Sequence, residues 1–278
     1  MQSLGKTLRT PLIKAVATGN DFVIVDLLQF NSTWEAEHGG RHRAKWVRDW
    51  CDRQRGIGAD GALFLEAHPQ CDFAWDFYNS DGSPAEMCGN AARAVALYRF
   101  LRSGQREMSF LTRSGVVKAR VDSPDSVEVV MAAIAQSEWK QATKNSAEPL
   151  NFDFIKAGVP HAVVQVNDLD DHDRLKTLAL AIKGEERFKD QGTNVTFVHA
   201  RSEQAIESVT FERGVEGFTL SCGTGAVAAA HTVLRGQEDR PLEVRVPGGR
   251  LQVVFKGGRP HLIGPARLLA EIHWFTGG

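Results

Sequence analysis

The chain has 278 residues, and its 42% hydrophobic and 24% charged residues are typical of a folded globular protein rather than a disordered one. Its formal net charge of −1 gives no reason to expect nucleic acid or an anionic membrane surface as a partner. No apolar run approaches the roughly 20 residues of a membrane-spanning helix, and residues 1–15 lack the apolar segment and cleavage site of a signal peptide.

Short β-rich segments separated by glycine turns dominate the first half of the chain. Residues 12–26 (LIKAVATGNDFVIVD) predict two strands around a glycine turn, and residues 35–54 suit a surface helix. Residues 62–66 (ALFLE) resemble a strand. Further segments carry alternating, β-branched or aromatic residues between turn signals, namely residues 73–83, 109–122 and 126–134.

The second half begins after a composition dip at residues 132–150, which we interpret as the passage between two halves. Residues 154–166 (FIKAGVPHAVVQV) again predict two strands around a glycine turn, and residues 168–184 suit a second surface helix. Strands are also expected within residues 208–214 and 243–255.

Three pairs of segments recur in the same order in the two halves. EMCGNAARAVAL (residues 86–97) matches TLSCGTGAVAAA (219–230), with Cys88 aligned on Cys222. LIKAVATGNDFVIVD resembles FIKAGVPHAVVQV, and RGIGADGALFLE lies opposite QGTNVTFVHA. Chance explains one such pair more easily than three, so we infer two homologous halves.

The alanine-rich runs after Cys88 and Cys222 are apolar almost all round, and such a short helix belongs inside a sheet. We therefore predict an α+β fold of two homologous, pseudo-symmetric domains, each a curved, mostly antiparallel sheet or barrel around a central helix. The first domain is expected at residues 1–131 with 265–278, and the second at 132–264. The active site is expected in the cleft between them.

RGIGADG (residues 55–61) is a literal GxGxxG, but it follows a helical segment and precedes a strand, the reverse of the dinucleotide-binding order. We interpret it as a glycine turn with a close backbone approach. The sequence contains no P-loop, HExxH or GxSxG, and its nine histidines lack metal-ligand spacing.

The chain has four cysteines and no CxxC pair, which favours free thiols in a reducing cytoplasm. Cys51 and Cys71 are interpreted as small buried hydrophobes. Cys88 and Cys222 each precede a glycine where a helix would begin, and a helix N-terminus lowers a thiol's pKa from ~8.5 and binds anions.

Two matching thiols suggest a pair that faces one ligand. A disulfide needs Cα atoms within about 7 Å, and a Cys/His hydrolase needs only one thiol. One thiolate acting as a base and one thiol acting as an acid, on opposite faces of a carbon, suit racemisation or epimerisation.

The chain resembles the diaminopimelate epimerase family, a group of cofactor-independent two-cysteine enzymes of lysine and peptidoglycan precursor synthesis. The resemblance runs from about Gly19 to Ala266. It rests on GNDF, RGIGADG, NSDGSPAEMCGNAAR, GVPH, GTNVTF, FERG and SCGTGA, in that order. It implies a soluble cytoplasmic isomerase with a small amino-acid substrate, LL-diaminopimelate converted to the meso form, without pyridoxal phosphate or a metal. A homodimer is compatible with it.

The resemblance also implies residue roles. The catalytic residues would be the base/acid pair Cys88 and Cys222, with His161 supporting one thiol and Glu212 the other. Contacts to the substrate would come from Asn20, Asn79, Asn194 and Arg213, and from the N-terminal N–H groups of Gly89, Asn90, Gly223 and Thr224. From the sequence alone, the preferred interpretation of His161 is a core histidine in the turn after Pro160.

Three positions depart from the family pattern. Val159 stands where the family commonly has asparagine before Pro-His, and Gly61 stands where some members have glutamine. The segment from Glu212 to Cys222 is one residue longer, which makes Glu216 a second candidate for the acidic role. These differences bear on substrate specificity rather than on the chemistry.

Other functions remain open at this point. The departures keep alive a racemase or epimerase of another amino acid, such as proline or histidine. A non-catalytic amino-acid-binding protein would use the cysteines only for packing. A redox-sensing pair would form a reversible link between Cys88 and Cys222.

Overall fold

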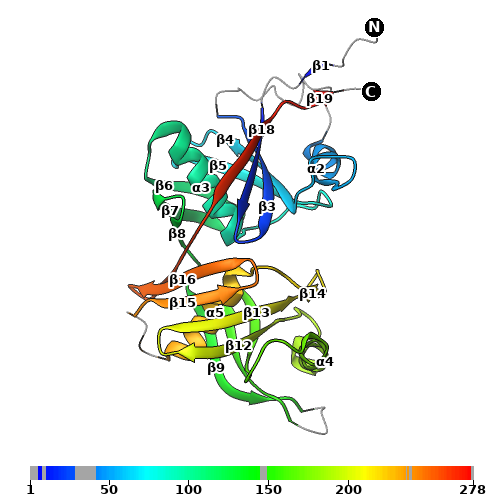
Figure 1. The fold of residues 1–278 in the computed structure, drawn as a ribbon, viewed down its shortest axis with the longest axis vertical. Helices are drawn as coiled ribbons and strands as arrows, with labels where there is room; N and C mark the ends of the chain where they lie inside the picture. Colours follow the sequence, from blue (N-terminus) through cyan, green and yellow to red (C-terminus); the bar gives the residue numbers. More distant parts are fainter. Residues whose placement is uncertain are drawn as a thin grey trace. The chain divides into compact units, whose positions relative to one another are not determined.

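The computed structural model describes residues 6–7, 11–28, 42–144, 149–235, 237 and 240–276. Contacts divide the chain into two compact units (Figure 1). The first unit comprises residues 1–129 and 265–278, and the second comprises residues 130–264.

The first unit is a sheet of mixed direction. Its strands are β2 (Leu12–Ala17), β3 (Asn20–Asp26), β4 (Gly61–Glu66), β5 (Phe73–Asn79), β6 (Glu107–Thr112), β7 (Gly115–Ser123), β8 (Ser126–Val130) and β18 (Arg267–Ile272). They pair in the order β18-β2-β3-β4-β5-β6-β7-β8. The β3–β4 and β5–β6 pairs are parallel and the others are antiparallel. A short pair, β1 (Lys6–Thr7) with β19 (Phe275–Thr276), lies apart from this sheet.

The second unit repeats this pattern. Its strands are β9 (Ile134–Ala142), β10 (Asn151–Ala157), β11 (Val159–Gln165), β12 (Asn194–Ser202), β13 (Ala205–Glu212), β14 (Gly217–Phe218), β15 (Leu242–Val246), β16 (Gly249–Lys256) and β17 (Arg259–Gly264). They pair in the order β9-β10-β11-β12-β13-β15-β16-β17, with β11–β12 and β13–β15 parallel. The small strand β14 pairs with the end of β13.

The parallel pairs explain where the helices lie, because parallel neighbours need a crossover connection. In the first unit α2 (Arg43–Cys51) connects β3 to β4, and α3 (Gly89–Ser103) connects β5 to β6. In the second unit α4 (His172–Lys183) and the short 3-10 helix η1 (Glu186–Phe188) connect β11 to β12, and α5 (Gly223–Leu234) connects β13 to β15. The same directions and crossovers recur, so the inferred repeat is confirmed.

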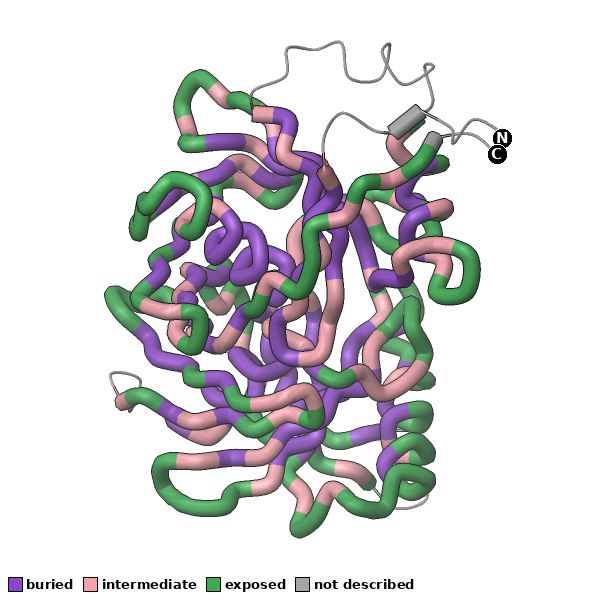
Figure 2. The backbone as a smooth tube through the Cα atoms, turned by 45° about the horizontal axis from the view of Figure 1, so that its top comes forward, coloured by how far each residue is buried: buried purple, intermediate pink, exposed green. Residues whose placement is uncertain are grey.

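The central helices are buried, as the sequence predicts. Every residue of α3 from Gly89 to Tyr98 is buried, and helix α3 packs against β2, β3, β7 and β18, strands from both ends of its sheet. Helix α5 packs against β10–β13 and β15–β17. Figure 2 shows buried residues in purple and exposed ones in green. Each sheet therefore curves around one helix, and the α+β fold with a repeated sheet around a helix is confirmed.

The outer face of each sheet is covered by the other crossover helix. In the first unit Trp46 and Trp50 of α2 stack at 5.6 Å between ring centroids, and Trp50 lies 5.8 Å from Phe64 of β4. In the second unit Leu175, Ala179 and Ile182 of α4 belong to the core cluster that includes Phe197. Since both faces of the central strands are buried, β4 reads as a continuous apolar run.

Three sequence interpretations change in detail. The predicted passage at residues 132–150 contains β9, whose residues are all partly or fully exposed, so a strand with a polar composition resembles a linker. Helix α2 occupies residues 43–51 of the predicted 35–54, of which residues 35–41 lie outside the described residues. The prediction at 168–184 becomes α4, whose N-cap Asp171 accepts a hydrogen bond from Arg174 N at 3.0 Å. Within the described residues, no helix is both long and apolar enough to cross a membrane.

Candidate functional site

The first candidate group surrounds the N-terminus of α3. Cys88 is the N-cap residue, with an extended backbone (φ −141°, ψ 124°) and a partly exposed side chain. Its carbonyl accepts the first helical bond from Ala92 N at 2.9 Å. The thiol therefore stands where the helix dipole favours a negative charge, and the first N–H groups, including that of Gly89, have no partner inside the helix. The N-cap position of Cys88 is the one expected from the sequence.

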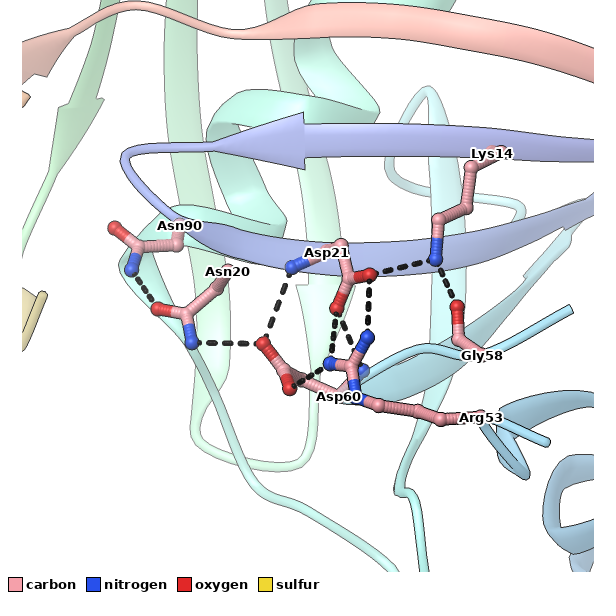
Figure 3. Close-up of polar contacts among 7 residues, drawn as sticks. All are labelled: Lys14, Asn20, Asp21, Arg53, Gly58, Asp60 and Asn90. Atoms are coloured by element: carbon pink, nitrogen blue, oxygen red, sulfur yellow. Dashed lines mark hydrogen bonds and ion pairs between the residues drawn. The ribbon is translucent and has the colours of Figure 1, made fainter. Parts of the chain in front are cut away.

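Asn90 and Asn20 meet beside this helix end. Asn20 begins β3, directly after the turn at Thr18 and Gly19, both of which have positive φ (49° and 88°). Asn90 is buried, and its Nδ2 donates to Asn20 Oδ1 in a short hydrogen bond (Figure 3). Two of the residues predicted from the sequence are thus in direct contact.

Arg93, one turn further along α3, is a buried cation. Its side chain is fully buried, and Nη2 donates to Thr18 Oγ1 at 2.6 Å and to Asn90 Oδ1 at 2.7 Å. Within the described part of the chain, Nε and Nη1 have no hydrogen-bond partner. Burial lowers the pKa of Arg93 to about 10, and the charge of Cys88 acts in the opposite direction. The guanidinium thus stays charged at neutral pH and interacts electrostatically with Cys88.

Asn79 lies at the end of β5, paired in register with Gly61 of β4. Its Nδ2 donates to Ser83 Oγ at 3.0 Å, and its side chain is exposed. A Cβ on Gly61 would lie 2.5 Å from Tyr78 O and 2.8 Å from a ring carbon of Phe77, so this position accepts no side chain without a shift.

The second candidate group surrounds the N-terminus of α5. Cys222 is the N-cap residue, with an extended backbone (φ −115°, ψ 109°), and its carbonyl accepts from Ala226 N at 2.9 Å. Cys222 Sγ lies 3.4 Å from Thr224 Oγ1. Gly223 is the first residue of the helix. The backbone geometry of Cys88 therefore recurs at Cys222.

Glu212, at the end of β13, contacts this second thiol. Burial raises the pKa of Glu212, while hydrogen bonds with Thr219 and Cys222 act in the opposite direction. The alternative acid, Glu216, has positive φ (55°) and forms an ion pair with Lys183 at 2.5 Å. Of the two acids, the structure brings Glu212 to Cys222.

His161, on β11, is fully buried between hydroxyl groups. Nδ1 lies 2.9 Å from Thr196 Oγ1, and Nε2 lies 3.0 Å from Thr224 Oγ1. Burial, followed by the charge of Arg213, lowers the pKa of His161 to about 3. The imidazole is therefore neutral, and within its own unit it reaches Cys222 through the hydroxyl of Thr224.

Asn194 and Arg213 form a small cluster in the same unit. Asn194 is buried, its Oδ1 accepts from Arg213 N at 3.0 Å, and its Nδ2 donates to Pro160 O at 3.3 Å. The Arg213 guanidinium donates to Gln191 O, and its residue is exposed. Asn194 therefore anchors the backbone of Arg213 and Pro160. Val159, before Pro160, supplies no polar side chain.

The remaining cysteines lie elsewhere. Cys51 is buried at the end of α2, and burial raises its pKa to about 12, as befits a small hydrophobe. Cys71 is partly exposed. In the described parts of the chain, no three His, Cys, Asp or Glu side chains gather as metal ligands would.

The sequence interpretation missed four residues that support these groups. Arg93 and Asp60 flank the Asn20–Asn90 pair, and Thr196 and Thr210, 3.1 Å apart, lie beneath α5. Arg93 was detectable as the one charged residue in the alanine-rich first part of α3, Gly89 to Leu97. Thr196 and Thr210 give no comparable signal, because threonine is ordinary in a strand.

Comparison with known proteins gives a consistent result. The family model described as "Diaminopimelate epimerase" matches residues 12–136 and 154–268. The diaminopimelate epimerase of Aquifex aeolicus is 36% identical over 274 residues, covering 93% of this chain and 98% of that protein. That of Chlorobaculum tepidum is 34% identical over 260 residues, covering 92% of this chain and 93% of that protein.

Solved structures share the fold at low identity. A hydroxyproline epimerase from Agrobacterium vitis matches with a TM-score of 0.67 and 17% identity, covering 96% of this chain and 93% of that one. A phenazine biosynthesis protein of the PhzF family from Bacillus anthracis matches with a TM-score of 0.67 and 13% identity, covering 98% and 100%. These likenesses concern the fold alone.

Proposed function

Because the chain belongs to the diaminopimelate epimerase family, we propose that it interconverts LL- and meso-2,6-diaminopimelate by a two-base mechanism that uses Cys88 and Cys222. The observation that carries this proposal is the pair of N-cap cysteines on the buried central helices of two units with the same topology. The product would serve lysine and peptidoglycan precursor synthesis in the cytoplasm.

The reaction needs no redox change. The thiolate of one cysteine takes the proton from the substrate α-carbon, forming an S–H bond and leaving a planar carbanion. The thiol of the other cysteine donates its proton to the opposite face, which inverts the centre and leaves a thiolate. The two sulfur atoms exchange roles, so the reverse reaction uses the same groups. The two thiols and the substrate account for every proton, so the proton transfers themselves need no further group.

Stabilising the carbanion is the difficult part of this reaction. The N–H groups of Gly89, Asn90, Gly223 and Thr224 belong to the first turns of α3 and α5, where anions are favoured. We propose that these groups bind the substrate α-carboxylate, so that the developing negative charge is stabilised by helix N-termini. We propose that Asn79, Asn194 and Arg213 hold the far end of the substrate, where a guanidinium suits a carboxylate.

A buried acid and a buried imidazole complete the second thiol's surroundings. Glu212 contacts Cys222, and the raised pKa of this carboxyl suits a group that exchanges a proton with a thiol. His161 is neutral and linked to Thr224, so it would act by hydrogen bonding rather than as a cation. We assign Glu212 and His161 to the support of the thiols on these contacts.

The test is an isomer assay of the purified protein with LL- and meso-diaminopimelate. Interconversion in both directions is expected, with no turnover of proline or histidine. Val159 and Gly61 are the positions that favour a different substrate, since neither offers a polar side chain to the far end of diaminopimelate. Turnover of proline or histidine, without turnover of diaminopimelate, would replace the proposed substrate. Binding without turnover would make the protein a binding module.

A further inference from the structure

The RGIGADG segment (residues 55–61) connects the C-terminus of α2 to Asp60, directly before β4. Its backbone closes the C-terminus of α2: Ile57 N and Gly58 N both donate to Trp50 O, at 2.8 and 2.9 Å. The approach is so close that a Cβ on Gly56 would lie 2.1 Å from Asp49 O. The segment then delivers Asp60 to β3. This is the close backbone approach predicted for the glycine turn.

Asp60 is fixed on β3 by both its backbone and its side chain. Asp60 N donates to Asp21 O at 2.9 Å. Its Oδ1 accepts from Arg53 Nη2 at 2.7 Å. Its Oδ2 accepts from Asp21 N at 3.2 Å and from Asn20 Nδ2 at 3.0 Å (Figure 3). The carboxylate is therefore attached to a strand, a guanidinium and the amide of Asn20.

The guanidinium that holds Asp60 is itself held. Arg53 donates to both carboxylate oxygens of Asp21 at 3.1 and 2.8 Å, and Lys14 Nζ donates to the same carboxylate at 2.7 Å. Burial acts to raise the pKa of Asp21, but the hydrogen bonds from Arg53 and Lys14 outweigh it and hold the pKa at about 2. Two carboxylates and two cations thus form one charge-assisted network.

The hydrogen bonds between α3 and this network all have the same direction, with each donor on the α3 side and each acceptor on the Asp60 side. Arg93 Nη2 donates to Asn90 Oδ1, Asn90 Nδ2 donates to Asn20 Oδ1, and Asn20 Nδ2 donates to Asp60 Oδ2. A guanidinium can only donate and a carboxylate can only accept, so the two ends specify how both amides are turned. If either amide inverted, N–H would face N–H or oxygen would face oxygen.

We propose that Asp60 is a positioning residue, which holds the side-chain amide of Asn20, and through it that of Asn90, in one orientation at the N-terminus of α3. The inference rests on the proposed function, in which Asn20 and Asn90 contact the substrate. Substrate carboxylates accept hydrogen bonds, so an inverted amide would present an oxygen where an N–H is needed. Asp60 acts through Asn20 and does not touch the substrate.

The test is a double-mutant cycle on kcat/KM with Asp60→Asn and Asn20→Ala. Asp60→Asn keeps the size of the side chain but no longer requires a donor from Asn20. We expect it to lower kcat/KM about tenfold in the parent, the effect of losing one hydrogen bond to a charged group. In the Asn20→Ala background, Asp60→Asn should lower kcat/KM by less than about twofold, because the residue through which Asp60 acts is gone.

A matched control is Asp72→Asn in the same unit. Asp72 Oδ2 accepts from Ser109 N at 2.7 Å and Oδ1 accepts from Gln105 Nε2 at 2.8 Å, without a bond to Asn20. This variant should keep kcat/KM within about twofold, since most substitutions away from a site change stability alone. Equal tenfold losses from Asp60→Asn in both backgrounds would overturn the inference and leave Asp60 a purely structural residue.

A readout that needs no activity separates this inference from the proposed function. In protein labelled with ¹⁵N-asparagine, the side-chain NH2 signals of Asn20 are those lost in Asn20→Ala. We expect their exchange with solvent to accelerate about tenfold in Asp60→Asn and to stay unchanged in Asp72→Asn. Accelerated exchange in a protein that does not epimerise diaminopimelate would refute the function but support the positioning. Unchanged exchange in an active enzyme would refute the positioning alone.

Discussion

The N-termini of α3 and α5 share a backbone design but differ in what surrounds them. Both begin after a cysteine N-cap with extended backbone, followed by glycine. Behind α3 lies a charged network that includes the buried guanidinium of Arg93 and the carboxylate of Asp60. Behind α5 lie neutral groups, namely the imidazole of His161 and the hydroxyls of Thr196, Thr210 and Thr224.

The difference begins at equivalent positions of the two repeats. Asn20 closes the β2–β3 hairpin opposite Ala17, and Val159 closes the β10–β11 hairpin opposite Ala157. Arg93 of α3 aligns with Val227 of α5, both five residues after the cysteine. The repeat thus preserves the helix N-terminus and its N-cap thiol, while the residues around them have diverged.

The two thiols are therefore not equivalent, although each is the N-cap of the central helix of its unit. Cys88 interacts with a cation, and Cys222 contacts the carboxyl of Glu212. A nearby cation favours thiolate, and a nearby carboxylate favours thiol, because two adjacent negative charges repel. One base and one acid is the combination that a two-base epimerase needs at the start of a turnover.

The largest expected effect comes from removing either thiol. Cys88→Ser and Cys222→Ser should each lower the rate of isomer interconversion by about 10³-fold or more, because a hydroxyl is a far weaker acid than a thiol and is hardly ionised at neutral pH. The measurement is the initial rate from each isomer. If one of the two variants kept the parent rate in both directions, its sulfur would have no part in the reaction.

Replacing Arg93 should distinguish the two thiols. Arg93→Met removes the cation near Cys88, so we expect about a tenfold slower alkylation of Cys88 by iodoacetamide at neutral pH, and an unchanged rate at Cys222. Mass spectrometry of the separate peptides gives both rates from one sample. Arg93→Lys keeps the charge, so its rate of Cys88 alkylation should lie between those of the parent and Arg93→Met. Equal slowing of both thiols would show that the variant has disturbed the whole protein.

The third residue after each cysteine tests the packing under the two helices. A Cβ on Gly225 would lie 2.4 Å from Thr210 Oγ1 and 3.1 Å from Thr196 Oγ1, whereas α3 carries Ala91 at this position. Gly225→Ala should therefore destabilise the protein by about 1–3 kcal/mol, although alanine is the better helix former. Denaturant unfolding measures the change. A stabilised variant would mean that the threonines give way freely.

The neutral imidazole behind α5 should make stability depend on pH. The pKa of His161 is about 3 in the folded protein against an ordinary 6.5, so between these values the unfolded chain binds the extra proton. Stability from this residue is therefore complete above about pH 6.5 and is lost as the pH falls towards 3. The parent should lose more stability than His161→Gln when urea unfolding is compared across this range. Parallel curves would show that His161 is not buried in neutral form.

The smallest effect is expected at Glu216. It is 56% exposed and pairs with Lys183 at the surface, so Glu216→Ala should change stability by at most about 1 kcal/mol. The kcat/KM of Glu216→Ala should stay within about twofold of the parent, whereas Glu212→Gln should lower kcat/KM by about 10²–10⁴-fold. Steady-state kinetics of the two variants make the comparison. The opposite order would move the acidic role to the inserted segment.

The repeat, the central helices and the family are readable from the sequence because each depends on local pattern. A glycine and then an alanine-rich run follow both Cys88 and Cys222, and this pattern predicts the start of a helix at each cysteine. The internal repeat is visible because both halves kept these runs.

The supporting residues could not be predicted in the same way. Asp60 and Asn20 are far apart in sequence, and only the parallel β3–β4 pair brings them together. The composition dip at residues 132–150 predicts a passage between the halves rather than a strand, because β9 has no fully buried residue and is therefore largely polar. Contacts that depend on strand pairing across a crossover leave no local signal in one sequence.

The most direct test of the two-base proposal is deuterium incorporation at the start of the reaction. LL-diaminopimelate is incubated with the enzyme in D2O, and early samples are separated into isomers and weighed by mass spectrometry. With two thiols on opposite faces, the first meso product carries deuterium at the inverted centre, while the remaining LL substrate keeps its hydrogen. Equal deuterium in the recovered substrate and the product would mean that one base serves both faces, and would contradict the proposed pairing of Cys88 with Cys222.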